Sequence, residues 1–310
     1  MLLTGCQADE TITDAQYKIG IVLSSSGLGD ESFNDSAFMG LQKARDELKV
    51  LFDYREAPDE NYESSLKELA QGDYNLIIGL GFSAQEALEK VAKEYPHKQF
   101  VLIDGQSDVK NILSVTFKPE ESSFLVGMIA AMTSKSGKIG FIGGMDSPVI
   151  NQFKNGFIEG AKHINSDIEI FSDYAGTFDD VTIGANIAED FINRGADFIY
   201  PAAGFTGVGA IKTAEENNIY AAGVDVDQFY LAERTIVTSA LKNVDDAIFQ
   251  IVQKYIEKSA IDQNSYSFGL AENGVGLAEI RVLHLSKKQQ EIITSTQKKL
   301  IAEKITIQAN

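Results

Sequence analysis

The sequence of 310 residues is short of several residue types that specific functions require. It has one cysteine, Cys6, no tryptophan and only five prolines. A single cysteine can neither close an intramolecular disulfide nor supply the thiolate cluster of a zinc or iron–sulfur site. The three histidines, His97, His163 and His284, stand alone without metal-ligand spacing. No segment reaches the ~18 consecutive apolar residues of a membrane span. We therefore expect a protein without a metal site or membrane-spanning helix.

Positive charge is also scarce. The chain has 27 Lys plus Arg against 45 Asp plus Glu, which gives a formal net charge of −18, and its sequence pI is near 4.6. Binding to nucleic acid depends on clustered cations that release counterions from phosphate, and this chain creates the opposite field. The charge balance therefore predicts no nucleic-acid partner.

Enzyme motifs are incomplete. Gly27-Leu28-Gly29 follows an apolar run, as in a dinucleotide fingerprint, but Ser32 occupies the place of the third glycine and Asp30 would repel pyrophosphate. No phosphate-binding loop of the G-x-x-x-x-G-K-[ST] type occurs. Asp225 and Asp227 could form a hydrolytic carboxylate pair, but both follow the apolar part of a predicted strand, and we expect one of them to miss the cleft. We predict no cofactor and no enzyme activity, with a nucleoside hydrolase as the remaining enzymatic alternative.

The pattern of the chain is typical of an α/β protein in which short buried strands alternate with amphipathic helices. Strands are predicted at 18–23, 50–54, 76–79, 100–103, 114–117, 138–142, 168–171, 197–200, 219–223, 236–241 and 266–269. Helices are predicted at 36–48, 62–69, 84–94, 120–132, 149–163, 181–193, 207–217 and 244–257. Four strand starts recur with similar spacing in each half, so we predict two doubly wound parallel sheets, one per lobe.

The lobes are expected to exchange chain at three places. With crossings near 117–119, 238–240 and 269–272, residues 18–118 plus 240–269 form an N-terminal lobe and 119–239 plus 270–310 a C-terminal lobe. Three crossing strands would act as a hinge that closes around a ligand. The alternative is one continuous sheet with a helical C-terminal extension, although single sheets rarely exceed ~10 strands.

Polar and aromatic residues mark the loops after the predicted strands. These loops are 24–40, 79–83, 104–105, 143–148, 176–180, 203–207 and 223–228. Ligands of open α/β sheets bind at these carboxyl ends. Phenyl rings that stack and carboxylates that accept from hydroxyl or N–H groups suit a flat, hydroxyl-rich ligand.

The N-terminus carries a possible lipidation site. Leu3-Thr4-Gly5-Cys6 resembles a bacterial lipobox, and the polar segment 7–16 is typical of a tether. The alternative is an incidental cysteine in a ragged terminus. We predict that residues 1–17 are the remnant of a lipobox and a flexible tether, with Cys6 as the lipidated residue.

Several motifs together resemble the basic membrane protein family, also called PnrA-like lipoproteins. They are Gly29-Asp30, Ser32-Phe33-Asn34-Asp35-Ser36-Ala37-Phe38 with Gly40, Ile103-Asp104-Gly105, Gly143-Gly144-Met145 with Pro148, Ile150, Phe153, Gly156-Phe157 and Gly160, Gly223-Val224-Asp225 with Asp227-Gln228, and Ser239 with Lys242. The resemblance extends from about Lys18 to beyond Gly276. It implies a type I periplasmic-binding-protein fold and an extracytoplasmic, lipid-anchored protein that binds purine nucleosides for an ABC permease and ATPase on separate chains.

The resemblance also implies a binding site. Phe38 and Phe205, beside Gly204, would sandwich the purine. Asn34 with Asp30 or Asp35 would meet the base edge, and the ribose would be held by Asp104, Asp225 and Lys242.

Structural roles compete with this assignment at several positions. Asp35 is equally suited to cap a helix, Phe33 fits the core better than the ligand, and Phe82 and Phe178 suit either place. Asp227 can cap a turn, and Lys242 can be a solvated lysine. For the whole protein, the alternatives are a sugar-binding protein or a ligand-sensing receptor on the same scaffold.

Overall fold

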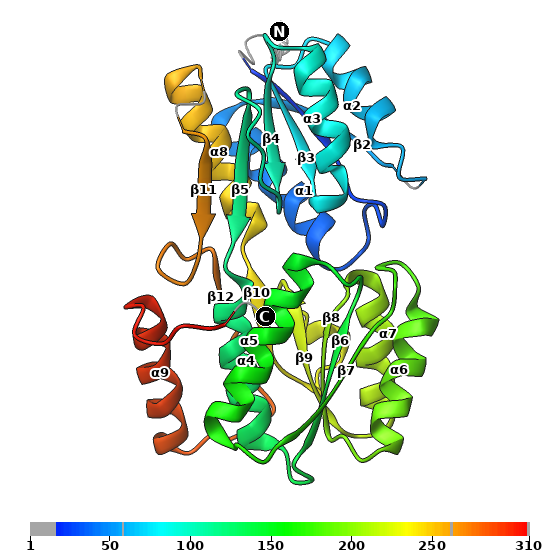
Figure 1. Cartoon of the computed structure of the whole chain (residues 1–310), viewed down its shortest axis with the longest axis vertical. Helices are drawn as coiled ribbons and strands as arrows, with labels where there is room; N and C mark the ends of the chain where they lie inside the picture. The colour runs from blue at the N-terminus through cyan, green and yellow to red at the C-terminus, as the bar shows by residue number, and fades with distance from the viewer. Residues whose placement is uncertain (1–16, 58, 261–262, 309–310) are drawn as a thin grey trace, which may run out of the picture.

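The computed structural model describes residues 17–57, 59–260 and 263–308, and it divides them into two α/β lobes (Figure 1). Each lobe is built on one six-stranded sheet. The N-terminal sheet has the order β11-β5-β4-β3-β1-β2, and the C-terminal sheet has the order β12-β10-β9-β8-β6-β7. The first five strands of each half follow the same winding pattern. Two sheets of this kind confirm the predicted pair of doubly wound lobes, and the single continuous sheet is excluded.

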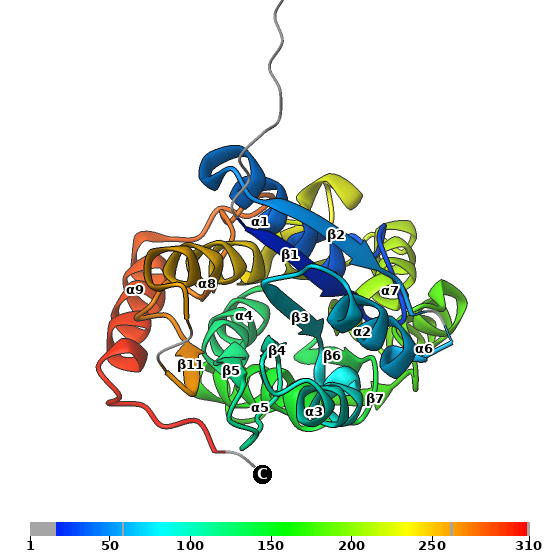
Figure 2. The ribbon, with the colours of Figure 1, turned by 90° about the horizontal axis from the view of Figure 1, so that it is seen from above.

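The N-terminal lobe consists of the following elements: β1 (Lys18–Val22), α1 (Phe33–Leu48), β2 (Leu51–Arg55), α2 (Tyr62–Gln71), β3 (Leu76–Leu80), η1 (Phe82–Ala84), α3 (Gln85–Glu94), β4 (Gln99–Ile103), β5 (Ile112–Phe117), α8 (Val244–Lys258) and β11 (Ser265–Phe268). All of its strand pairs are parallel. Alternate strand side chains point to opposite faces, so Ile19 and Ile21 pack toward α1 and α8, while Val22 packs toward α2 and α3. Figure 2 shows these helices on the two sides of the sheet.

The C-terminal lobe repeats this plan with its own elements: α4 (Pro119–Thr133), β6 (Lys138–Gly143), α5 (Pro148–Ile164), β7 (Glu169–Tyr174), α6 (Val181–Asn193), β8 (Phe198–Ala202), α7 (Gly204–Glu216), β9 (Tyr220–Asp225), η2 (Phe229–Leu231), β10 (Ile236–Lys242), β12 (Val275–Leu277) and α9 (Lys287–Ile301). In the described part of this lobe, β12 is antiparallel to its neighbour β10, and the other strand pairs are parallel. Helices α4 and α5 cover one face, and α6 and α7 cover the other. Among the described residues, no helix is long and apolar enough to cross a bilayer.

The chain passes between the lobes at three places. The first passage is at Lys118, between β5 and α4, and the third runs from Gly269 to Gly274, between β11 and β12. The second is at Asn243 rather than at 238–240, because β10 stays paired with β9 and β12 up to Leu241 and Lys242. Helix α8 then packs against α1 of the N-terminal lobe.

Helix α9 was not predicted, although its sequence contains a start signal. Ser286 caps the helix by accepting from the backbone N–H of Gln289, whose side chain accepts from the N–H of Ser286 in return. This reciprocal arrangement is a capping box. Helix α9 buries Ile293 and Leu300 and packs against α4.

Candidate functional site

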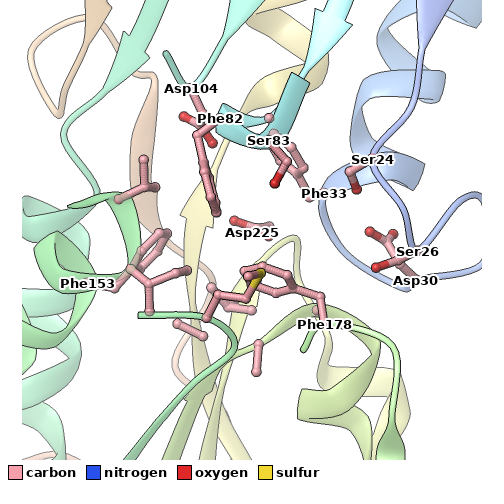
Figure 3. A pocket seen from close by; sticks show the side chains of 18 of the residues that line it. Ser24, Ser26, Asp30, Phe33, Phe82, Ser83, Asp104, Phe153, Phe178 and Asp225 are labelled. Atoms are coloured by element: carbon pink, nitrogen blue, oxygen red, sulfur yellow. The ribbon is translucent and has the colours of Figure 1, made fainter. Parts of the chain in front are cut away.

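A cavity lies between the lobes where strands of both sheets end (Figure 3). Its walls come from the loops after β1, β3, β4, β6, β7 and β8, from the first turns of α1 and α5, and from the ends of β9 and β10. The lining residues are Ser24, Ser25, Ser26, Asp30, Phe33, Gly81, Phe82, Ser83, Asp104, Met145, Val149, Ile150, Phe153, Phe178, Ala202, Ala203, Gly204, Val224, Asp225 and Lys242. The position matches the expectation for open α/β sheets, whose strand ends and helix N-termini meet there.

Four phenyl rings dominate the apolar wall. Phe33 and Phe82 come from the N-terminal lobe, and Phe153 and Phe178 come from the C-terminal lobe. Figure 3 shows Phe33 and Phe178 on opposite sides of the cavity. Phe178 is held close to the backbone, since a Cβ atom at Gly144 would lie 2.2 Å from its ring. A flat, apolar group of a ligand could therefore contact phenyl rings of both lobes at once.

A buried charged cluster of Lys242, Asp104 and Asp225 lies in the wall of the cavity. Lys242, at the end of β10, pairs with Asp104, which follows β4, and their side chains are 3% and 7% exposed. The Lys242 ammonium also lies 4.5 Å from the ring centre of Phe33 and 5.2 Å from that of Phe117. Asp104 and Asp225 both adopt left-handed backbone conformations, with φ of 60° and 63°. Left-handed non-glycine residues of this kind concentrate at functional sites.

Asp225 is the second carboxylate of this cluster. It accepts a hydrogen bond of 2.5 Å from the Ser32 hydroxyl of the other lobe. Burial raises the pKa of Asp225 above its ordinary value, and the repulsion of Asp104 adds to this effect, while Lys242 and Ser32 oppose it. Since the cluster brings two carboxylates to one ammonium, it is suited to hydroxyl or other donors on a neutral ligand.

Hydroxyl groups and Asp30 line one side of the cavity, where the loop after β1 contributes Ser24, Ser25 and Ser26 (Figure 3). The Asp30 carboxylate accepts from the backbone N–H groups of Ser32, Asn34 and Asp35 and from the Asn34 side-chain amide. Burial nevertheless raises its pKa to about 6, with these donors opposing the rise. Asn34 in turn accepts from the backbone and hydroxyl of Ser24. Asp30 and Asn34 thus fix the loop that carries the serines.

Five of the nine residues predicted for ligand binding line the cavity: Asp30, Asp104, Gly204, Asp225 and Lys242. The structure does not bring the other four to it. Phe38 packs edge-to-face on Phe52 and Tyr54 of β2, with centroid distances of 5.5 Å to each. Phe205 is 37% exposed at the start of α7.

Asn34 and Asp35 instead have structural roles. Asn34 is fully buried, with its amide bonded to Ser24 and Asp30. Asp35 accepts from the backbone N–H groups of Gly29 and Glu31 and so holds the loop before α1. Asp35 is the third residue of α1, and Ser32 is at the cap position, so the capping alternative for Asp35 is wrong: its carboxylate binds the loop and not the free N–H groups of the helix.

The sequence did not predict the four rings that line the cavity as ligand-binding residues. Phe33, expected in the core, is the first residue of α1, and this position directs it into the cleft. For Phe82 and Phe178 the sequence favours neither the core nor the cavity, and Phe153 belongs to one of the motifs that carry the family resemblance. The position of Phe153 near the start of α5, after the glycine-rich loop that follows β6, is the sequence feature that could have predicted its place at the cavity.

The remaining candidates lie elsewhere. Asp227 bonds to the Arg281 guanidinium at 2.7 Å and to the N–H of Phe229, away from the cavity. Within the described residues, no group of three or more His, Cys, Asp and Glu side chains is arranged to hold a metal ion. Cys6 and the predicted lipobox lie outside the described residues.

Comparisons with known proteins place the chain among substrate-binding proteins of ABC transporters. Residues 18–310 match the family model described as ABC transporter substrate-binding protein PnrA-like. The chain is 33% identical to basic membrane protein D of Borreliella burgdorferi strain JD1, with 89% of this chain and 83% of that protein covered. It is 32% identical to the ABC transporter nucleoside-binding protein BmpA of Lactococcus lactis subsp. cremoris, with 99% and 94% covered. A solute-binding protein of an ABC transporter system from Aeropyrum pernix K1 superposes with a TM-score of 0.87 at 28% identity, with 95% and 94% covered.

Proposed function

The chain belongs to the PnrA-like family of ABC transporter substrate-binding proteins, with the type I fold of periplasmic solute-binding proteins, and we propose that it binds purine nucleosides in the interlobe cavity. The observation that carries the proposal is the pair of rings, Phe33 and Phe178, that face the cavity from opposite lobes. Stacking of a base on an aromatic ring is worth about 1–3 kcal/mol. A purine offers two flat faces, so it can use both rings, and both are in place only when the lobes meet.

The charged cluster is suited to the sugar. Asp104 and Asp225 supply acceptors for ribose hydroxyls, and Lys242 supplies a donor. Hydrogen bonds to charged groups contribute about 1.5–3 kcal/mol each. With Asp30 included, three carboxylates and one ammonium line the cavity. This charge balance disfavours a phosphate group, so we expect nucleosides to bind and nucleotides to be rejected.

The hydroxyl-lined side of the cavity is suited to the base edge. Ser24, Ser25, Ser26 and Ser83 are neutral and can each donate or accept a hydrogen bond. The four donors on Asp30 leave its carboxylate little capacity for a ligand. We therefore expect the site to accept both 6-oxo and 6-amino purines.

Membership of the family indicates where the protein acts and which partners it has. Substrate-binding proteins of ABC importers act outside the cytoplasmic membrane and deliver their ligand to a permease that is driven by a separate ATPase. For this chain we propose attachment to the outer face of the membrane through a lipid on Cys6. Metabolic labelling with an azide- or alkyne-tagged fatty acid tests the anchor, and loss of the label in Cys6→Ser is the expected result.

A calorimetric panel tests the ligand. Adenosine, inosine and guanosine are compared with ribose, arabinose, hypoxanthine and adenosine monophosphate. We expect submicromolar affinity for at least one nucleoside and affinities at least a hundredfold weaker for ribose and the nucleotide. Preferential binding of a free sugar would overturn the proposal in favour of a sugar-binding protein, and release of hypoxanthine from inosine would identify a hydrolase. Copurification with the tagged protein separates transport from sensing. Recovery of permease subunits is expected for a transport protein, and their absence is expected for a sensing receptor.

A further inference from the structure

The lobes also touch outside the cavity, where the loop before α1 meets the segment after β9. Glu31 of the N-terminal lobe receives two contacts there: Gln228 Nε2 donates to its backbone carbonyl at 2.8 Å, and the Tyr230 hydroxyl donates to its carboxylate. Because β1 ends at the cleft, the start of α1 faces the C-terminal lobe (Figure 1). Neither Glu31 nor Gln228 lines the cavity.

The Gln228 side chain is built into its own lobe in one orientation. Its Oε1 accepts from the backbone N–H of Val224 at 2.9 Å, and its backbone N–H donates to the Ser239 hydroxyl at 3.1 Å. Rotating the amide by 180° would bring its NH2 group against an N–H and its oxygen against the Glu31 carbonyl, so both bonds would be lost. A Cβ atom at Gly223 would lie 2.9 Å from the Gln228 Cβ, so glycine is what leaves room for this arrangement.

Burial distinguishes this contact from its neighbour. Gln228 is 1% exposed, whereas Tyr230 is 54% exposed. The exposed Tyr230 hydroxyl can form a hydrogen bond with water in place of Glu31. The Gln228 amide and the Glu31 backbone are instead held in place by hydrogen bonds within their own lobes. The Gln228–Glu31 hydrogen bond is partly buried, so it should affect the equilibrium between open and closed lobes more than the exposed bond of Tyr230 does. The backbone of Glu31 is itself fixed, since its N–H donates to Asp35 at 3.0 Å.

We propose that Gln228 is a positioning residue that holds the lobes closed through the Glu31 carbonyl and thereby sets the rate at which ligand leaves. Opening the lobes must break this bond, and a ligand enclosed by both lobes leaves only after opening. The contact stabilises the closed form relative to the open form, so it changes dissociation and leaves the first encounter with the open form unaffected. The kinetic readout rests on the proposed nucleoside binding, whereas the effect on lobe closure does not.

Gln228→Glu is the sharpest test, because it keeps the size of the side chain and the acceptor for Val224 but places an oxygen against the Glu31 carbonyl. Gln290→Glu is the matched control: Gln290 also donates its amide to a backbone carbonyl, that of Leu285, at 3.1 Å, but on the surface of α9. In stopped-flow measurements with adenosine and inosine, we expect Gln228→Glu to raise the dissociation rate by about tenfold, with an association rate that is unchanged or higher, because only the open form admits ligand. Gln290→Glu should change neither rate.

Lobe closure is measured independently by fluorescence transfer between dyes on Glu86→Cys in α3 and Lys162→Cys in α5, in a Cys6→Ser background. We expect Gln228→Glu to shift the population toward longer interlobe distances, without ligand and at subsaturating adenosine. Gln228→Met, which has similar volume and no donor, replaces it if the glutamate variant does not fold. Wild-type dissociation rates together with unchanged distances would overturn the inference. If wild type binds no nucleoside, the proposed function fails. The role of Gln228 in lobe closure is then tested by comparing the interlobe distances of wild type and Gln228→Glu without ligand.

Discussion

Lys242 of the C-terminal lobe and Asp104 of the N-terminal lobe form an ion pair that is almost fully buried, although 138 positions separate them in the sequence. Lys242 is the last residue of β10, directly before the chain passes to the N-terminal lobe at Asn243. The pair therefore lies beside a passage between the lobes and in the wall of the cavity. Its energetics should differ from those of the surface ion pairs of the same protein.

Removal of the lysine charge tests this difference. Lys242→Met leaves Asp104 buried without its partner, and breaking a buried pair costs about 3–5 kcal/mol of unfolding free energy. Lys43→Met is the control, because the Lys43–Asp246 pair has a similar composition but both side chains are 40% exposed; exposed pairs contribute less than about 1 kcal/mol. Urea unfolding measures both. Equal losses of unfolding free energy in the two variants would show that the buried ion pair of Lys242 matters no more for stability than the exposed pair of Lys43.

The aromatic wall makes a prediction about affinity. Phe33→Ala and Phe178→Ala should each weaken nucleoside binding by about tenfold or more, because each removes one stacking face. Isothermal titration calorimetry measures the change. Phe38→Ala and Phe205→Ala should leave the affinity within about threefold of wild type, since neither ring lines the cavity. The reverse result would restore the sandwich of Phe38 and Phe205.

The Asp30 carboxyl predicts a pH dependence of stability. Its pKa in the folded protein is raised to about 6 from an ordinary value near 3.8, so the folded state holds the proton more tightly than the unfolded chain does. The resulting stabilisation is fully present below about pH 3.8 and is lost as the pH rises through about 6, by at most about 3 kcal/mol.

Asp30→Asn isolates this contribution from the other carboxyl groups. The unfolding free energy of wild type minus that of the variant should fall between pH 4.5 and pH 7, as measured by urea unfolding at both values. A difference that is flat or rises with pH would contradict the raised pKa of Asp30.

Helices α4 and α5 pack so closely that glycine is required at their contact. A Cβ atom at Gly160 would lie 1.9 Å from the carbonyl oxygen of Phe124. Gly160→Ala should therefore destabilise the protein by about 1–3 kcal/mol or more, as overpacking of a core does. Gly276→Ala is the control, because the added methyl group has no described atom within 4 Å apart from those of Gly276 and its two chain neighbours. Thermal unfolding compares them, and equal midpoints would mean that the helices separate without cost.

The alternation of buried strands and amphipathic helices was sufficient to predict both sheets, since each strand of a doubly wound lobe is an apolar run between two helical patterns. The boundary at Asn243 was missed because β10 continues through Lys242, a residue whose charge argues against a buried strand end. Asp104 is what makes that burial acceptable, and it belongs to the other lobe. Helix α9 was missed because few of its residues are buried, despite its capping box.

The sequence by itself determined the family, the two-lobed α/β architecture and the carboxylates at the strand ends, because these follow from local periodicity and from motifs that are contiguous in the chain. Only the tertiary structure decided which rings enter the cavity. Phe33 and Phe38 lie five residues apart on α1, so they point in different directions around the helix axis: one faces the cleft and the other faces β2. That choice depends on how α1 is rotated against its sheet and its opposing lobe, and no local pattern specifies this rotation.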